Sequence, residues 1–310
     1  TGGPGAVLWM WISAFFGMVT NYSENVLGLY YRKKEKDGSF SGGAFYYIAY
    51  GIKQRWLGML AAIFCLLAAV GMSGVQTNKI TGSYTSVLGN DSAAVKLIIG
   101  GIVAFFAAIV IIGGIKRIGR IASMLVPFMS LLFIAMAFVI IGKNYTAVPE
   151  TFRLIFTSAF SSKAVAGGVG GFAFSQIIKK GLARGVFSNE AGLGSSVIAH
   201  SASETREPVR QGLWGIFEVF FDTFVICTLT ALVILTTNIG SGAYENGSFF
   251  GAVNAAGEFV GASDSATALS AFSSNLGMFG TVAFLIILPL FAFTTVLAWS
   301  YYGEKAVDFC

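Results

Sequence analysis

Long apolar runs separated by short polar segments dominate this chain. Six runs are long enough for the roughly 20 residues that a helix needs to cross a bilayer. They cover about Gly5 to Tyr31, Trp56 to Ile80, Val95 to Ile115, Ile121 to Ile141, Leu213 to Thr237 and Leu276 to Tyr302. The pattern predicts an all-α membrane protein, a polytopic helical bundle.

A seventh apolar stretch is interrupted by polar residues and glycines. A helix-like stretch to Lys180 precedes Arg184–Ser196, which holds a carboxylate, a carboxamide, three hydroxyls and three glycines. Ser195–Ser203 then resembles a half-helix. Because lipid offers no water to backbone groups, such a segment must line a cavity enclosed by protein. Transporters bind ions and small solutes in cavities of this kind.

The charge of the connecting segments predicts how the chain threads the bilayer. Basic residues concentrate in Arg32–Asp37, Lys116–Arg120 and Glu204–Arg210, which we therefore place in the cytoplasm. We expect Gly142–Lys163 and Asn238–Asn275 to be loops, and the second, which lacks Lys and Arg, to be external. The exception is a basic group formed by Lys179, Lys180 and Arg184, which precedes the interrupted segment on the expected outer side.

The composition agrees with a membrane protein. Apolar residues make up 55% of the chain and charged residues 11%, with a mean hydropathy of +0.74, whereas soluble domains carry about 25% charge. The net charge of +5 lies in short loops and is not a nucleic-acid signal. Three isolated cysteines, Cys65, Cys227 and Cys310, predict neither a disulfide framework nor a metal site.

Glu24 is an ionisable residue inside the first run. Such a group costs about 2.5 kcal/mol or more at the centre of a membrane, so it is a functional candidate by default. Asn21, Glu24 and Asn25 have helical spacing and share one face. Alternatively, Glu24 lies near the helix end and pairs with Lys33 or Arg32.

Asp222 is a second acid, in the middle of the fifth run. Glu218 lies four residues earlier and shares its face. An acid at this depth needs a cation, a basic residue or a proton as partner. Two interpretations stay open: a sodium site, or a structural carboxyl group held by the interrupted helix.

Other polar residues late in the second and last runs are candidate ligands. The Gln76 amide offers donors and acceptors for a zwitterion, or forms a hydrogen bond between helices. Thr294 and Thr295 offer neutral oxygens to a small hard cation, or bond back to their own helix. Trp299 lies on the face of Thr295 and either caps a small cavity or belongs to an interfacial aromatic belt.

Two other classes of membrane protein fit the sequence less well. Gly71–Gly74 reads Gly-Met-Ser-Gly, which matches the string of rhomboid-type serine proteases, with Ser73 as nucleophile and His200 as base. However, a polar exit from the membrane follows His200, which favours a structural histidine. An ion channel would show a repeated filter loop or a ring of pore residues, and neither is found in the sequence.

Several strings together resemble those of the alanine or glycine:cation symporter family. The longest, Ala183–Ser195, reads ARGVFSNEAGLGS and is far more specific than a single short motif. The other matching strings are Gly3–Ala6 with Trp9–Trp11, Gly113–Gly119, Ile198–His200, Pro208–Leu213, Asp222–Thr223, Thr230–Leu235 and Thr294–Thr295. The resemblance covers nearly the whole chain, although Glu204–Glu207 is more charged than the family pattern.

The resemblance implies a leucine-transporter-like fold of two inverted five-helix repeats, whose broken first and sixth core helices hold the substrate. Residues 1–310 would then form a single transmembrane transporter domain that contains about core helices two to eight. We expect the chain to be a fragment that lacks the first and the last two core helices.

The resemblance also implies roles for particular residues. Gln76, Phe187, Ser188, Asn189, Glu190 and Gly192 would contact the amino acid, and Trp299 would limit its size. Thr294 and Thr295 would form part of a sodium site. The predicted activity is sodium-coupled symport of small neutral amino acids, alanine and glycine, across the cell membrane, without an organic cofactor and without an enzymatic reaction.

An alternative within transport is a proton-coupled or exchange carrier of amino acids. Its coupling carboxylate would be Glu24, Glu190 or Asp222. The expected partners in either case are the amino acid and the lipid bilayer. The intramembrane serine protease remains a more remote alternative.

Overall fold

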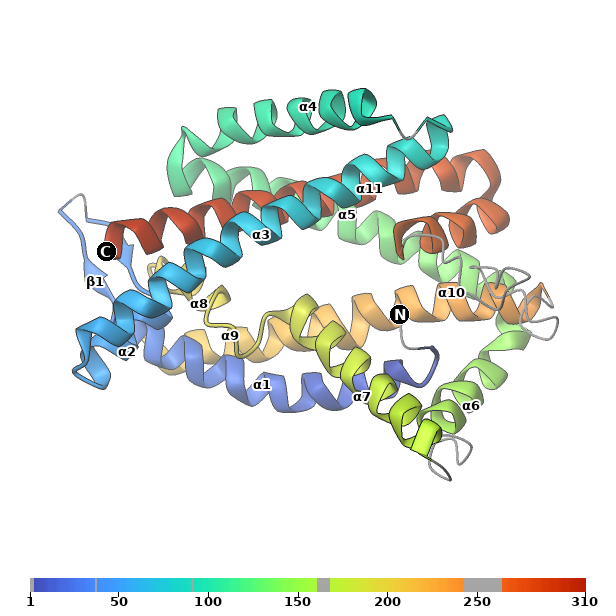
Figure 1. The fold of residues 1–310 in the computed structure, drawn as a ribbon, viewed down its shortest axis with the longest axis horizontal. Coiled ribbons are helices and arrows are strands. Elements are labelled where there is room, and N and C mark those ends of the chain that lie inside the picture. Colours follow the sequence, from blue (N-terminus) through green and yellow to red (C-terminus); the bar gives the residue numbers. More distant parts are fainter. Residues whose placement is uncertain (1–2, 37, 91, 161–167, 242–263) are drawn as a thin grey trace. The chain divides into compact units, whose positions relative to one another are not determined.

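Helices make up nearly all of the computed structural model, which describes residues 3–36, 38–90, 92–160, 168–241 and 264–310 (Figure 1). The helices before the interrupted segment are α1 (Ala6–Tyr30), α2 (Ala44–Gly51), α3 (Arg55–Leu88), α4 (Ala93–Ile111), α5 (Gly114–Lys143), the 3-10 helix η1 (Tyr145–Ala147) and α6 (Val148–Ala159). The rest are α7 (Gly168–Asn189), α8 (Ser196–Ser201), α9 (Pro208–Val219), the π-helix η3 (Phe220–Cys227), α10 (Thr228–Gly240) and α11 (Asp264–Phe309).

Five helical segments among the described residues are long and apolar enough to cross a membrane. They are Arg55–Leu88, Ala93–Ile111, Gly114–Lys143, Pro208–Gly240 and Ser265–Phe309. They correspond to the last five of the six expected runs, although the helix expected over Val95–Ile115 already ends at Ile111. The first expected run forms α1, a helix of 25 residues, which is not among these five, so a membrane span there stays a prediction. The predicted all-α, multi-pass membrane architecture is therefore confirmed at this level.

The prediction of loops is wrong at several places. Lys116–Arg120 lies within α5 because the chain turns at Gly113 and Gly114, where Gly114 has a φ of +66°, so the next helix begins before the basic residues. The expected loop Gly142–Lys163 contains η1 and α6, in which Ile155 and Ala159 are fully buried. Of the expected loop Asn238–Asn275, both ends are helical, and residues 242–263 lie outside the described residues.

A short hairpin in the first basic segment was not predicted. Strand β1 (Lys33–Lys34) pairs antiparallel with β2 (Phe40–Ser41), with Lys33 opposite Ser41. The pairing follows α1 directly and turns the chain back toward α2. Two residues per strand are too few to show the alternation by which a strand is recognised in a sequence.

The described chain divides into two compact units. The first unit comprises residues 1–71, 155–228 and 299–310, and the second comprises 72–154 and 229–298. The interrupted segment, α1, α9 and Trp299 belong to the first unit. Gln76, Thr294 and Thr295 belong to the second. Whether residues 1–310 act as the single transporter domain predicted from the sequence stays a prediction.

In the first unit, α1 lies in close contact with α7 and α9, and glycines on these two helices make the approach possible. A Cβ atom on Gly181 of α7 would lie 2.5 Å from the carbonyl oxygen of Ala6, and one on Gly212 of α9 would lie 2.7 Å from the Tyr22 ring. Small residues at such crossings let membrane helices pack backbone to backbone. The helix that carries Asn21 and Glu24 is thereby held against both neighbours.

In the second unit, aromatic side chains of α5 and α11 form a core around Phe272. Its ring centroid lies 5.8 Å from that of Phe133 and 5.3 Å from that of Phe284. Nearby, the Asn275 amide links two other helices, because it accepts a hydrogen bond from Asn144 (2.6 Å) and donates one to Thr237 (2.8 Å). These contacts join α5, α10 and α11.

The crossing of α1 and α7 is testable with a single methyl group. Gly181→Ala should destabilise the protein by about 1–3 kcal/mol, because the new Cβ meets backbone, which cannot turn aside as a side chain can. Thermal unfolding of the purified protein measures the effect. Gly101→Ala, in α4 where an added Cβ meets nothing within 4 Å, is the matched control and should not lower the unfolding temperature. Equal unfolding temperatures for the two variants would contradict the close crossing.

Candidate functional site

The glycine-broken polar segment Arg184–Ser196 forms the end of α7, a tight turn and the start of the short helix α8. Helix α7 ends at Asn189, and α8 begins at Ser196, where the sequence predicts a half-helix. Between them, Glu190 has a φ of +57°, and Gly192 and Gly194 have φ values of +87° and +68°. Glycine adopts this left-handed region readily, whereas a glutamate there is uncommon and marks a position that the surrounding structure enforces.

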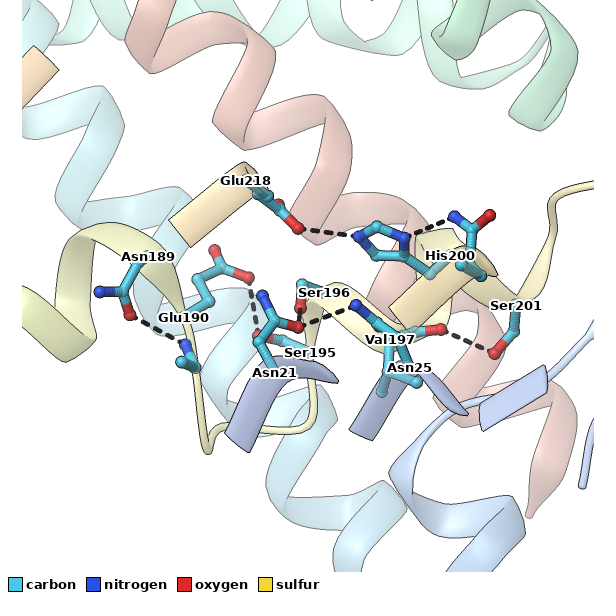
Figure 2. Close-up of polar contacts among 12 residues, drawn as sticks. Asn21, Asn25, Asn189, Glu190, Ser195, Ser196, Val197, His200, Ser201 and Glu218 are labelled. Atoms are coloured by element: carbon cyan, nitrogen blue, oxygen red, sulfur yellow. Dashed lines mark hydrogen bonds and ion pairs between the residues drawn. The ribbon is translucent and has the colours of Figure 1, made fainter. Parts of the chain in front are cut away.

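Glu190 is held in this conformation by two hydrogen bonds to its carboxylate. The Ser195 hydroxyl donates to Oε2 over 2.7 Å, and the Trp299 indole Nε1–H donates to Oε1 over 2.9 Å. Figure 2 shows the Glu190 side chain lying over Ser195 at the start of α8. Each carboxylate oxygen has a second acceptor position, so Glu190 can still accept hydrogen bonds from a ligand.

Asn189 closes the turn from the inside. Its Oδ1 accepts the N–H of Ala191 over 3.1 Å, and its Nδ2 donates to Thr223 Oγ1 over 3.1 Å. The side chain is buried, and both its oxygen and its nitrogen are engaged in these hydrogen bonds within the protein. Asn189 thus fixes the direction in which the chain leaves α7.

Asp222 is bound to the same end of α7. The Ser188 hydroxyl donates to Oδ1, and the Thr223 hydroxyl donates to Oδ2, each over 3.0 Å. Asp222 lies in η3, and π-helical turns within α-helices are frequent at functional sites. Of the two interpretations from the sequence, these contacts favour a carboxyl group held by the interrupted helix.

Glu24 satisfies the backbone of the turn. Its Oε2 accepts the N–H of Gly192 over 3.2 Å, and its Oε1 accepts the N–H of Gly194 over 3.1 Å. The contacts described for Glu24 are therefore with backbone amides of the turn, and not with the basic residues at the end of α1, the pairing considered from the sequence. A carboxylate is a strong acceptor for such amides.

Asn21 contacts the start of α8, and Asn25, on the same face of α1, bonds to Asn21. Asn25 Nδ2 donates to Asn21 Oδ1 over 2.9 Å, and the Ser196 hydroxyl donates to the same oxygen over 3.3 Å (Figure 2). Both asparagines are fully buried. The predicted polar face of α1 is thus directed at the interrupted segment.

Arg32 fastens the chain that leaves α8, a role that the sequence did not predict. Its guanidinium donates to the carbonyl oxygens of Ser201 (3.1 Å), Ser203 (2.6 Å) and Thr205 (2.6 Å), and it lies 3.8 Å above the Phe40 ring. Partial burial lowers the pKa of Arg32 from its ordinary value. Nothing in the spacing of the sequence indicates that this arginine, one of a basic run, faces inward.

His200 contacts two residues of α9. Its Nε2 lies 2.8 Å from Glu218 Oε2, and its Nδ1 lies 2.6 Å from Gln211 Nε2. Both ring nitrogens are thus engaged within the protein, which agrees with the structural histidine that the sequence favours.

The other candidate residues from the sequence lie on three different helices. Phe187 lies half-buried on the last turn of α7, and Gln76 lies half-buried on α3. The hydroxyls of Thr294 and Thr295 donate to the carbonyl oxygen of Phe291, over 2.9 and 3.0 Å, as one of the two interpretations from the sequence expects. Their oxygen lone pairs are not consumed by these bonds.

The polar groups at the turn are oxygen donors. Within the described ranges, no group of three or more His, Cys, Asp or Glu side chains could hold a metal ion. Hydroxyls, amides and single carboxylates are instead the polar groups gathered at the turn. Such oxygen donors suit hard cations.

Curated relatives match the chain over almost its full length. It is 40% identical over 313 residues to a sodium/alanine symporter of Methanococcus maripaludis, which covers 99% of this chain and 64% of that protein. It is 36% identical to a probable sodium/glutamine symporter of Bacillus subtilis, over 99% of this chain and 59% of that protein. It is also 36% identical to a putative sodium/proton-dependent alanine carrier of Bacillus subtilis, over 99% of this chain and 61% of that protein.

The chain therefore spans about three fifths of the length of these relatives. A family model described as the sodium:alanine symporter family matches residues 1–310. This is a family of transporters and not of enzymes, so the protease alternative built on Ser73 and His200 is not supported. The chain belongs to the sodium:alanine symporter family.

Proposed function

We propose that this chain takes part in sodium-coupled symport of small neutral amino acids, chiefly alanine and glycine, across the cell membrane. The observation that carries the proposal is the break between α7 and α8, which directs the Glu190 carboxylate into a turn held by Ser195 and Trp299. Family membership supports transport of an amino acid with a cation. We further propose a leucine-transporter-like fold, in which a broken helix of this kind lies at the binding site.

In this proposal Glu190 binds the ammonium group of the substrate. Its two oxygens keep acceptor positions beside the bonds from Ser195 and Trp299. We assign the further contacts with the amino acid to Phe187, Ser188, Asn189 and Gly192, as the family resemblance implies. Because Glu24 already accepts the N–H groups of Gly192 and Gly194, we do not assign these two amides to the substrate carboxylate. The contact of Gln76 with the amino acid stays a proposal that rests on the family resemblance alone.

Sodium is co-transported, and Thr294 and Thr295 are its proposed ligands. Each hydroxyl donates its hydrogen to Phe291, which orients the oxygen lone pairs away from that bond and leaves them available to a hard cation. Binding of sodium and amino acid stabilises the same closed state, so the gradient of one ligand drives movement of the other.

A second candidate is coupling to protons, or exchange, through Glu24, Glu190 or Asp222. The observation in its favour is that the contacts described for Asp222 are hydroxyl donors, which suit either a carboxylate or a carboxylic acid. The name of one relative, a putative sodium/proton-dependent alanine carrier, points the same way.

Uptake of labelled alanine by the full-length protein in proteoliposomes tests the proposal. An inward sodium gradient at equal pH on both sides should drive accumulation, and unlabelled glycine should compete whereas leucine should not. Accumulation driven by a pH gradient and indifferent to sodium would move the coupling to a carboxylate. Absence of alanine uptake by folded protein would overturn the substrate assignment.

Trp299 offers a prediction that separates bulk from hydrogen bonding. Trp299→Phe keeps an aromatic ring but removes the Nε1–H donor to Glu190, so the apparent KM for alanine should rise about tenfold, as expected for a lost bond to a charged group. Trp299→Ala should in addition admit larger substrates such as glutamine. Trp56→Phe, at an exposed tryptophan of α3, is the control and should transport as the wild type does. An unaltered KM in Trp299→Phe would show that the indole does not serve the site.

Thr295 offers a prediction about sodium. Thr295→Val keeps the shape but removes the hydroxyl, so the sodium concentration for half-maximal uptake should rise about tenfold, and Thr295→Ser should restore it. Thr281→Val provides the control, because the Thr281 hydroxyl also bonds back to its own helix, donating to Gly277, but is exposed. Identical sodium dependence of Thr295→Val and Thr281→Val would exclude Thr295 as a ligand.

A further inference from the structure

Three polar side chains form a stripe along α9 and η3. Gln211 and Glu218 are seven residues apart, and Glu218 and Asp222 are four apart, so successive members lie on one face of the helix. The sequence predicts the pairing of Glu218 with Asp222 on a face. It does not indicate what this face meets.

The stripe contacts the interrupted segment on both sides of the turn. On the α7 side, Asp222 accepts a hydrogen bond from Ser188 over 3.0 Å. On the α8 side, His200 lies 2.8 Å from Glu218 and 2.6 Å from Gln211. Figure 2 shows His200 projecting from α8 toward Glu218. The helix formed by α9 and η3 therefore contacts both α7 and α8.

The hydrogen-bond pattern of His200 is complete. The carboxylate of Glu218 lies within hydrogen-bond distance of Nε2, and the amide of Gln211 lies within hydrogen-bond distance of Nδ1. The His200 side chain is 14% exposed, and that of Glu218 is 44% exposed. Two partners on one helix fix both the position and the plane of the ring.

Helix α8 depends on such contacts because it is short. With six residues, Ser196–Ser201, it has less than two turns, and a helix of this length has little stability of its own. Arg32 and Asn21 hold its two ends to α1 and the hairpin. His200 supplies its polar contact with α9.

We propose that His200 is a positioning residue of the transport site. Together with Glu218 it fixes α8 relative to the end of α7, and so fixes the place of Ser195, which holds the Glu190 carboxylate. The proposal rests on the proposed function in that Glu190 binds the substrate. His200 itself touches no substrate.

Transport kinetics of the full-length protein test the proposal. His200→Ala and Glu218→Ala should each raise the apparent KM for alanine about tenfold, because a hydrogen bond to a charged group is lost, and change the maximal rate little. His200→Gln, whose amide can donate to Glu218 and accept from Gln211, should restore most of the affinity. The double alanine variant should be no worse than the worse single variant, since the pair is already broken.

Glu207→Gln, an exposed glutamate directly before α9 whose side chain does not cap that helix, is the control and should leave the KM unaltered. Wild-type KM values in both alanine variants would overturn the proposal. So would a double variant whose effect is the product of the two single effects.

Thermal unfolding of the wild type, the two single alanine variants and the double alanine variant gives an answer that does not depend on transport. A shift in unfolding temperature of the double variant that is smaller than the sum of the single shifts supports the His200–Glu218 link. Additive shifts overturn it. Should the wild type transport no amino acid, the proposed function fails, and the unfolding cycle still decides whether the link exists.

Discussion

A break in a helix leaves backbone groups that must find other hydrogen-bond partners, and this constraint governs the structure around the interrupted segment. The turn between α7 and α8 leaves N–H and C=O groups that a continuous helix would pair. Glu24 accepts two of these N–H groups and Asn189 accepts a third. Arg32 binds one carbonyl oxygen at the end of α8 and two beyond it. Without such partners, a broken helix could not persist in a membrane.

The side chains that bond to the turn can reach it because α1 packs closely against both α7 and α9. Glycines bring α1 against α7 and α9, so short side chains such as Asn21 bridge from one helix to the next. The same closeness leaves little room for rearrangement. Glu190, in a left-handed conformation that a glutamate seldom adopts, is held by Ser195 on one side and Trp299 on the other. A binding group that is fixed in this way loses little entropy when a ligand arrives.

Much of this arrangement could be predicted from sequence, because long apolar runs and a glycine-broken polar motif have clear physical meaning. The spans, the half-helix after Ser195 and the polar face of Asn21, Glu24 and Asn25 were predictable from periodicity. Helix α6 is not evident in the sequence because its apolar run is short, and the hairpin at Lys33–Ser41 is not evident because it has only two residues per strand. The partners of Glu24 and Arg32 were not predictable, because they lie 168 to 173 residues away in the sequence. The partners of His200 depend on which face of α9 is turned toward α8, and the sequence does not indicate that face.

The central claim is that Glu190 receives the ammonium group of an amino acid. Calorimetric titration of alanine into the full-length Glu190→Gln variant in sodium buffer tests it most directly, because glutamine keeps the size and the acceptor for one of the two donors but removes the charge. The account predicts an affinity at least about tenfold weaker than that of the wild type, since an ion pair is replaced by a neutral contact, with a similar unfolding temperature. Alanine binding of wild-type strength by this variant would contradict the claim.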